Sequence, residues 1–258
     1  MVKHTRHIRT TPGSLATVLA LISLAAGAVL LPSAVDAGQT ANGWVLTEPK
    51  RRAPDAPLAA APSLPAGAQS IEPTTFDIVL RRESPLMKGQ VVRQTVSRTS
   101  EQIHLRGNDN REWLFERNPI DHRRVSATLI DHSSKAIVLY EETDLRMTLG
   151  IRGWADVLAL GFDSQTLRHY KRTAETRAVG TMSFVRYVST ATSGSVDEVW
   201  WSEEQVLPSR FSIGEGGGRT RFSIERVRGG TDASVLRPAT ARFPEYSVYD
   251  LAGWLEKH

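Results

Sequence analysis

Apolar and polar residues alternate along most of the chain after Thr74, and this period of two predicts β-strands. The first strand would place Phe76, Ile78 and Leu80 on one face. Two further strands, on either side of a turn at Asn118-Pro119, would share an apolar face. That face would consist of Trp113, Phe115, Val125, Ala127 and Leu129.

The clearest alternation lies between Leu145 and Ile151, where apolar residues are interleaved with Arg146 and Thr148, and we expect another strand here. Its apolar face would contain Leu145, Met147, Leu149 and Ile151. Turn-forming residues at 107–110 and 131–134 separate the predicted strands. Short connections favour antiparallel hairpins, since parallel strands need a longer crossover.

Helical spacing of apolar residues appears in two places. The first is 152–162, and the second closes the chain, where Ser247 would cap a helix and Asp250 would reach back as in a capping box. A long antiparallel sheet must curl to bury its inner face. We therefore expect a mainly β (α+β) fold: a curled antiparallel sheet, as a barrel or half-barrel, with the two short helices packed on it.

The first 37 residues have the features of a secretory signal. Lys3, Arg6 and Arg9 precede an uncharged apolar run at 15–31, and small residues at 35–37 form a cleavage site. The alternative is an uncleaved membrane anchor, although the run is at the short end of the roughly 17–25 residues that span a bilayer. Cleavage after Ala37 would leave no stable transmembrane segment.

Residues 38–73 are rich in Pro and Ala and contain one aromatic residue, Trp44. Such a segment buries too little apolar surface to offset its ordering entropy, which predicts a disordered linker. Residues 74–258 would then form a single β half-barrel domain. The chain has no cysteine, which excludes a lipoprotein signal, disulfides and thiolate chemistry. An exported protein without cysteine is typical of the bacterial periplasm.

Removal of the signal, which carries three basic residues and one acidic residue, lowers the formal net charge from +4 to +2. Acidic and basic residues are interspersed in the rest of the chain without a basic stripe. The charge pattern therefore argues against nucleic acid as a partner.

No motif of catalysis or metal binding stands out. The dipeptides Asp121-His122 and Asp131-His132 would lie at the two ends of one strand, roughly 30 Å apart, which is too far to share a metal. The glycine-rich run 214–218 lacks the Lys-Ser/Thr of a phosphate loop and predicts a hairpin tip. No serine-centred elbow accompanies the histidines. We expect neither an enzyme nor a bound cofactor.

The segment 196–213, VDEVWWSEEQVLPSRFSI, resembles a strand pair of the lipoprotein-carrier-like (LolA-like) half-barrels of Gram-negative periplasms. AVGTMSFVRY at 178–187 is similar to the preceding strand in an uncharacterised branch of that superfamily, although it lacks the cysteine of that branch. The likeness extends over about 74–230. It implies a concave apolar face, covered by helices, that holds acyl chains or another hydrophobic ligand.

No functional residue is carried over from that family, and the apolar pattern of this chain predicts eight residues on the lining of such a face: Trp113, Phe115, Leu129, Leu145, Met147, Trp154, Phe184 and Trp200. A lipid tail buried there would gain about 0.8 kcal/mol per methylene. The chain would then be a non-catalytic periplasmic carrier of a lipid or of lipoprotein acyl chains. Alternatively, the same side chains fill a solid core. The chain would then be an envelope interaction or regulatory module with an exposed aromatic patch around Trp201 or Trp254.

Overall fold

The computed structural model describes residues 71–84, 87–162, 167, 169–189, 198–215 and 218–257. The expected signal and nearly all of the expected linker lie outside these ranges. Ile71 is buried at the start of the described chain, and the Gly230 amide donates to the Pro73 carbonyl oxygen over 2.9 Å. Among the described residues, no helix is long and apolar enough to cross a membrane.

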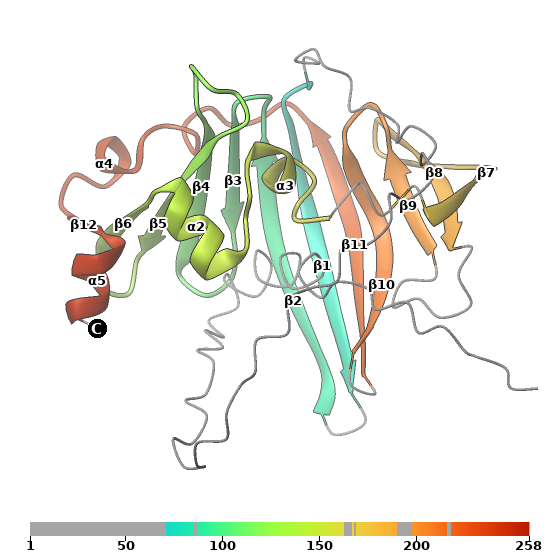
Figure 1. Cartoon of the computed structure of the whole chain (residues 1–258), viewed down its shortest axis with the longest axis horizontal. Coiled ribbons are helices and arrows are strands. Elements are labelled where there is room, and N and C mark those ends of the chain that lie inside the picture. The colour runs from blue at the N-terminus through green and yellow to red at the C-terminus, as the bar shows by residue number, and fades with distance from the viewer. Residues whose placement is uncertain are drawn as a thin grey trace, which may run out of the picture.

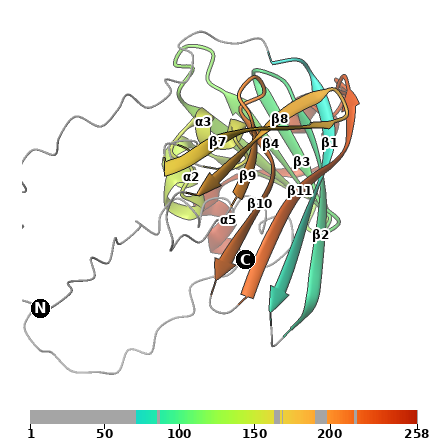
Figure 2. The ribbon, with the colours of Figure 1, turned by 90° about the vertical axis from the view of Figure 1, so that its right-hand side faces the viewer.

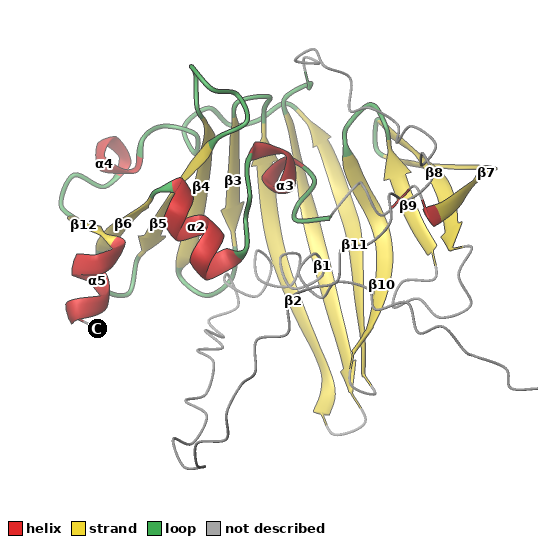
Figure 3. Cartoon of the chain, in the orientation of Figure 1, coloured by secondary structure: helices red, strands yellow, loops and turns green. Residues whose placement is uncertain are grey.

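Twelve strands form one sheet in the described part of the chain (Figure 3). The strands are β1 (Thr74–Ser84), β2 (Met87–Arg98), β3 (Gln102–Arg106), β4 (Arg111–Arg117), β5 (Val125–Asp131), β6 (Ala136–Tyr140), β7 (Tyr170–Val179), β8 (Met182–Ser189), β9 (Glu198–Ser202), β10 (Leu207–Glu215), β11 (Gly218–Gly229) and β12 (Ser247–Asp250). The helices are α2 (Glu142–Leu149), α3 (Trp154–Leu158), α4 (Ala239–Arg242) and α5 (Leu251–Lys257).

The sheet consists of two meanders joined along one seam. One meander runs from β6 to β1 and the other from β11 to β7, and β1 pairs with β11 in antiparallel fashion. β12 adds outside β6 as a parallel strand. The terminal strands β12 and β7 do not pair with each other in the described ranges, so the sheet is open. Figures 1 and 2 show it curled, with α2 and α3 on its concave side. The prediction of a half-barrel is confirmed.

The alternating residues predicted from the sequence do form the inner face. Phe76, Ile78 and Leu80 on β1 are buried in the main apolar cluster. The two strands around the turn at Asn118-Pro119 are β4 and β5, and the residues predicted for their shared face are all buried in the same cluster. At the predicted hairpin tip, Glu215 on β10 pairs with Gly218 on β11, and residues 216 and 217 lie outside the described ranges.

The strand predicted between Leu145 and Ile151 is wrong, because this segment contains most of helix α2. Leu145 and Leu149 are buried four residues apart on one face of the helix, whereas Met147 is 81% exposed. The Glu141 amide donates to Asp144 Oδ2 over 3.0 Å, which fixes the helix start. Gly150, with φ of +68°, ends it. A spacing of four residues satisfies a helix as well as a strand.

The two predicted helices are present but shorter than expected. The first is α3, and the left-handed backbone of Leu160 and Gly161 (φ of +52° and +78°) follows it. The second is α5, and Ser247 is not its cap. Ser247 instead starts β12, where its amide donates to the Lys135 carbonyl oxygen over 3.1 Å. Asp250 Oδ1 accepts from the Gly253 amide over 2.8 Å in the first turn.

Candidate functional site

The concave face of the sheet is a continuous apolar wall. The ladders from β1 to β6 place Trp113 between Leu105 and Leu129, and Phe115 between Ile103 and Ala127, as cross-strand neighbours. The Trp113 ring lies 5.7 Å from that of Phe115 and 5.0 Å from that of Tyr140, between centroids. Such aromatic contacts add to the free energy gained by burial. The wall continues onto the second meander through Phe211 and Phe222, which stack at 4.8 Å.

The structure buries six of the eight predicted lining residues in one cluster; of the other two, Trp200 packs against that cluster from the opposite face and Met147 does not belong to it. The main apolar cluster contains Trp113, Phe115, Leu129, Leu145, Trp154 and Phe184. Met147 is on the exposed side of α2. Trp200 is half-buried and pairs in register with Arg186 and Arg210, on the face opposite to its neighbour Trp201.

Trp201, not Trp200, occupies the inner position on β9. It is 4% exposed, and its ring centroid lies 5.5 Å from that of Phe162. The expectation of an exposed aromatic patch around Trp201 is therefore wrong. Trp254, the other residue suggested for such a patch, is half-buried on α5, with its ring centroid 5.7 Å from that of Tyr249.

The segment 142–162 covers the concave wall. Its buried side chains, Leu145, Leu149, Ile151, Trp154 and Val157, belong to the same apolar cluster as the sheet. The Trp154 amide donates to the Arg123 carbonyl oxygen over 2.9 Å, which fixes the start of α3 beside the β4–β5 connection. The cover thus consists of two short helices and the turns around them.

A buried arginine links this cover to the sheet. Arg98, at the end of β2, is fully buried. Its guanidinium donates to the carbonyl oxygen of Leu158 over 3.3 Å and to that of Gln205 over 2.5 Å. No carboxylate among the described residues contacts it, and its Nε has no hydrogen-bond acceptor there. Burial lowers the pKa of Arg98 to about 10, because desolvation disfavours the charged form.

Trp113 provides a second unsatisfied donor in the same wall. Its indole Nε1 is buried without a hydrogen-bond partner in the described part of the molecule. A buried donor without an acceptor costs about 1–3 kcal/mol. Arg98 pairs with Ile103 on β3, and Trp113 lies on the next strand, β4, so the two donors belong to one region of the wall. An apolar wall with two unsatisfied donors can accept a molecule that combines an apolar body with hydrogen-bond acceptors.

A separate polar cluster lies on the outer face of β3–β5. Glu112 is 3% exposed and lies 2.9 Å from His104 Nε2, 3.2 Å from His132 Nε2 and 2.5 Å from the Arg242 guanidinium. Burial alone would raise the pKa of Glu112. The hydrogen bonds from His104 and Arg242 outweigh it and hold the pKa well below its ordinary value. The cluster attaches the segment around α4 to the sheet.

The Asp-His dipeptides predicted to lie far apart serve different local purposes. Asp121 Oδ1 accepts from the Arg123 amide over 3.1 Å in the turn before β5. Asp131 Oδ1 accepts from the Ser133 amide over 2.9 Å in the turn after it. Both aspartates stabilise turns, and His132 belongs to the Glu112 cluster.

Sequence reasoning missed Arg98 and the Glu112 cluster. Arg98 follows a regular strand pattern, and only the absence of an apolar residue at an inward position marks it. His104 on β3 and Glu112 on β4 each alternate with apolar neighbours, as solvent-facing residues of a strand do. The segment that covers them contains Arg242, which follows Glu112 by 130 residues in the sequence. Local periodicity contains no information on such coverage.

No family model and no curated protein matches the chain. The chain does match solved structures, at low sequence identity. A DUF1329 family protein from Desulfovibrio piger is 7% identical, with 67% of this chain and 92% of that chain covered and a TM-score of 0.35. A LolA superfamily protein from Nitrosomonas europaea is 9% identical, with 70% and 99% covered and a TM-score of 0.28.

The MucA/MucB complex of Pseudomonas aeruginosa also matches, at 12% identity and a TM-score of 0.35, with 67% of this chain and 58% of that chain covered. The chain thus spans less than two thirds of the matched protein in that complex. The LolA superfamily is the group that the strand pair at 196–213 resembles.

Proposed function

We propose that the chain is a non-catalytic protein of the bacterial periplasm that binds a hydrophobic ligand, a lipid or a lipoprotein acyl chain, on the concave face of its half-barrel. The apolar wall supplies the binding energy, at about 0.8 kcal/mol for each methylene buried. The predicted signal at 1–37 would export the protein, and the predicted linker at 38–73 would precede the folded domain. No step of the proposed function requires a covalent bond to form or break.

The observation that carries the proposal is the attachment of the cover through Arg98. An uncompensated buried guanidinium is costly, and a packed core without a ligand is more stable with an apolar side chain there. Its bond to the Leu158 carbonyl oxygen ties the cover to β2 through a contact that can exchange for the acceptor of a ligand. The open sheet gives the cover room to move, because the wall does not close into a barrel.

The proposal is tested by native mass spectrometry of the protein purified from its own cells, with organic extraction of bound molecules. We expect a co-purifying apolar molecule that is lost on denaturation. A clean protein mass that stays unchanged after incubation with lipid would contradict ligand binding.

Adjacent tryptophans supply a matched pair of variants. Trp201→Ala removes a ring from the inner face and should lower the amount of bound ligand, whereas Trp200→Ala removes the same ring from the opposite face and should leave it unchanged. Equal retention in two folded variants would argue against the concave wall as the site. Circular dichroism establishes that both variants are folded.

A second function, an envelope protein-interaction module, is supported by exposed apolar residues near the edge of the sheet that β6 and β12 form. Leu139 on β6 is 44% exposed, Val248 on the adjacent β12 is 50% exposed, and Leu255 on α5 is 64% exposed. Exposed apolar side chains gathered on neighbouring elements are typical of a protein-binding surface. Val248→Ser combined with Leu255→Ser should abolish capture of such a partner without affecting bound lipid.

A further inference from the structure

Arg98 carries a positive charge that no carboxylate balances in the described part of the molecule. Its side chain is fully buried, and the acceptors around it are neutral: the carbonyl oxygens of Leu158 and Gln205 and, over 3.3 Å, Oε1 of Gln205. Its Nε has no acceptor among the described residues. A buried charge is costly unless an opposite charge and hydrogen bonds compensate it. The site therefore lacks one negative charge and at least one hydrogen-bond acceptor.

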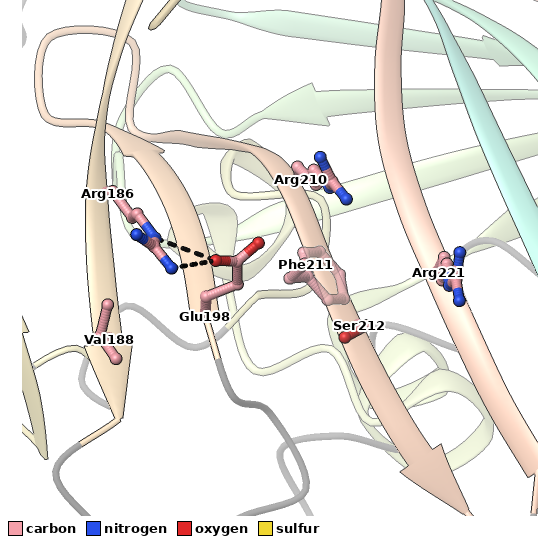
Figure 4. Close-up of a pocket in the computed structure, with 7 residues that line it drawn as sticks. All are labelled: Arg186, Val188, Glu198, Arg210, Phe211, Ser212 and Arg221. Carbon is pink, nitrogen blue, oxygen red and sulfur yellow. Dashed lines mark hydrogen bonds and ion pairs between the residues drawn. The ribbon is translucent and has the colours of Figure 1, made fainter. Parts of the chain in front are cut away.

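Two other covered arginines of this chain do have a carboxylate partner. Arg242 on α4 binds Glu112 on the outer face of the first meander. Arg186 binds Glu198 at 2.9 Å in a pocket of about 350 Å³ on the outer face of the second meander, and Figure 4 shows this pair. Arg98 is more deeply buried than either of these arginines. Its lack of a partner is thus a property of its position on the concave face and indicates a partner from outside the chain.

The strand register places Arg98 at one end of the concave wall. Arg98 pairs with Thr74, the first residue of β1, and so lies at the end of β2 opposite to the β1–β2 hairpin. The β9–β10 turn at Gln205 and the end of α3 at Leu158 meet at the same end. Figure 1 shows β1, β2, β10 and β11 extending past α2 and α3 in the other direction. The uncompensated charge thus lies at the covered end of the sheet, and the apolar wall extends away from it.

Trp113 adds a second donor without an acceptor on the same wall. Its buried indole Nε1 has no hydrogen-bond partner in the described part of the chain. Arg98 pairs with Ile103, Ile103 pairs with Phe115, and Trp113 lies two residues from Phe115 on β4. With neighbouring strands about 4.8 Å apart and two residues spanning about 6.7 Å, the Cα atoms of Arg98 and Trp113 lie about 12 Å apart. Two long side chains at this separation can donate to one ligand group.

We propose that the ligand of the concave face is a long-chain carboxylate, such as a free fatty acid, whose carboxylate binds the Arg98 guanidinium while its alkyl chain lies along the apolar wall. This inference rests on the proposed function and specifies its ligand. One carboxylate supplies the single negative charge that balances one guanidinium, and its oxygens accept hydrogen bonds from both Nε of Arg98 and Nε1 of Trp113.

Other head groups fit this site less well. A phosphate monoester carries about 1.5 to 2 negative charges, which would leave excess negative charge buried beside a single guanidinium. An alcohol or an ester supplies an acceptor but no charge, so the guanidinium would stay uncompensated. The charge balance therefore favours a monoanion.

Ligands of equal chain length separate the contribution of the head group from that of the alkyl chain. Laurate, dodecanol and dodecyl phosphate are titrated into the purified full chain, freed of bound lipid on a hydrophobic resin, and their affinities are measured by calorimetry. We expect laurate to bind about tenfold to a hundredfold more tightly than dodecanol, because a hydrogen bond to a charged group contributes more than a neutral one. Laurate should also bind more tightly than dodecyl phosphate.

Substitution of Arg98 tests the assignment of the carboxylate partner. Arg98→Met replaces the buried charge by an apolar side chain and should leave the protein folded, since such replacements are often neutral or stabilising. It should lower the laurate affinity to that of dodecanol and leave the dodecanol affinity within about twofold, because the alkyl chain binds through apolar burial. Arg186→Met is the control: it removes a guanidinium from the outer-face pocket and should leave the preference for laurate unchanged.

Trp113→Phe removes the indole N–H and keeps an aromatic ring on the wall. It should weaken laurate binding about twofold to tenfold relative to dodecanol, through the loss of one hydrogen bond. Trp201→Phe makes the same change at another buried position of the wall, where it should alter both affinities to the same extent.

Equal affinities for laurate and dodecanol overturn this inference and leave the proposed function intact, because both molecules then bind through apolar burial alone. Tighter binding of dodecyl phosphate than of laurate also overturns it and assigns the site to a phosphate head group. A preference for laurate that persists in Arg98→Met overturns the role of Arg98. If none of the three molecules binds, the proposed function is contradicted, and this inference with it.

Discussion

Trp200 and Trp201 show how strongly one position along a strand changes the role of a side chain. Trp201 contacts Phe162 in the apolar cluster, and Trp200 lies among arginines on the opposite face. The sequence shows that the two rings must point to opposite faces, but not which ring is inside. The pairing of Val199 with Phe211 decides it, because Val199 and Trp201 then share the inner face.

At the scale of single residues, Phe184→Ala should lower the free energy of unfolding by about 3–5 kcal/mol, because it removes a fully buried ring from the cluster. Met147→Ala should change it by less than about 0.5 kcal/mol, since that side chain is 81% exposed. Urea denaturation measures both values. A small loss for Phe184→Ala would mean that its pocket collapses or is filled by a ligand.

Glu112 gives a pH-dependent prediction. Its pKa is lower in the folded chain than the ordinary 4.5, so its stabilising contribution is complete above pH 4.5 and decreases as the pH falls below that value. Glu112→Gln should cost about 3 kcal/mol at pH 7, because it leaves the Arg242 charge without its buried partner beside His104, His132 and Arg106.

The difference between the wild type and Glu112→Gln should shrink as the pH is lowered toward 3, as measured by urea denaturation at each pH. Glu245→Gln is the control, since it makes the same chemical change at an exposed position of the same covering segment. A difference that does not depend on pH would contradict the assigned role of the carboxylate.

At the scale of elements, the sequence predicts strands better than the helix that covers them. Alternation predicts the strands around Phe76, Trp113 and Leu129, because each has one buried apolar face and one more polar face. The 145–151 segment alternates equally well, yet the cap at Asp144 and the left-handed Gly150 make it a helix. Only the residues at the two ends of this segment distinguish a helix from a strand. The alternation within it therefore led to the wrong prediction of a strand.

Gly153 sets the approach of α3 to the sheet. A Cβ at this position would lie 2.6 Å from the Arg123 carbonyl oxygen, so Gly153→Ala must displace backbone. We expect a loss of about 1–3 kcal/mol in the free energy of unfolding and faster hydrogen exchange in residues 154–158. Gly229→Ala is the matched control, because a Cβ there meets nothing within 4 Å. Equal exchange of α3 in the two variants would contradict this role of Gly153.

At the scale of the whole molecule, the two ends of the sheet are protected in different ways. β7 is largely exposed and carries Lys171, Arg172, Glu175 and Arg177, and charged edge strands resist pairing with other chains. The opposite end is apolar at β6 and is capped by the four residues of β12. Protection at that end thus depends on one short parallel strand.

Truncation before Ser247 should therefore expose the edge of β6 and cause concentration-dependent association, measured by light scattering. Truncation after Asp250 keeps β12 and serves as the comparison, because it removes only α5. If both truncations associate equally, α5 and not β12 protects the edge.

The curled sheet and the apolar wall could be predicted from the sequence, since both follow from alternation. The Glu112 cluster could not, because His104, Glu112 and Arg242 come from β3, β4 and α4 and form no run along the chain.

The seam between β1 and β11 also sets the order in which the molecule can fold. Each meander consists of neighbours in sequence and can form as soon as its own strands are available. The seam joins the first strand of one meander to the last strand of the other, so it must wait for both, and closing so long a loop costs entropy. Folding is expected to be slow relative to a helical protein of this size. Until the seam forms, β1 and β11 remain two long open edges, so the unfinished molecule can pair with another chain there.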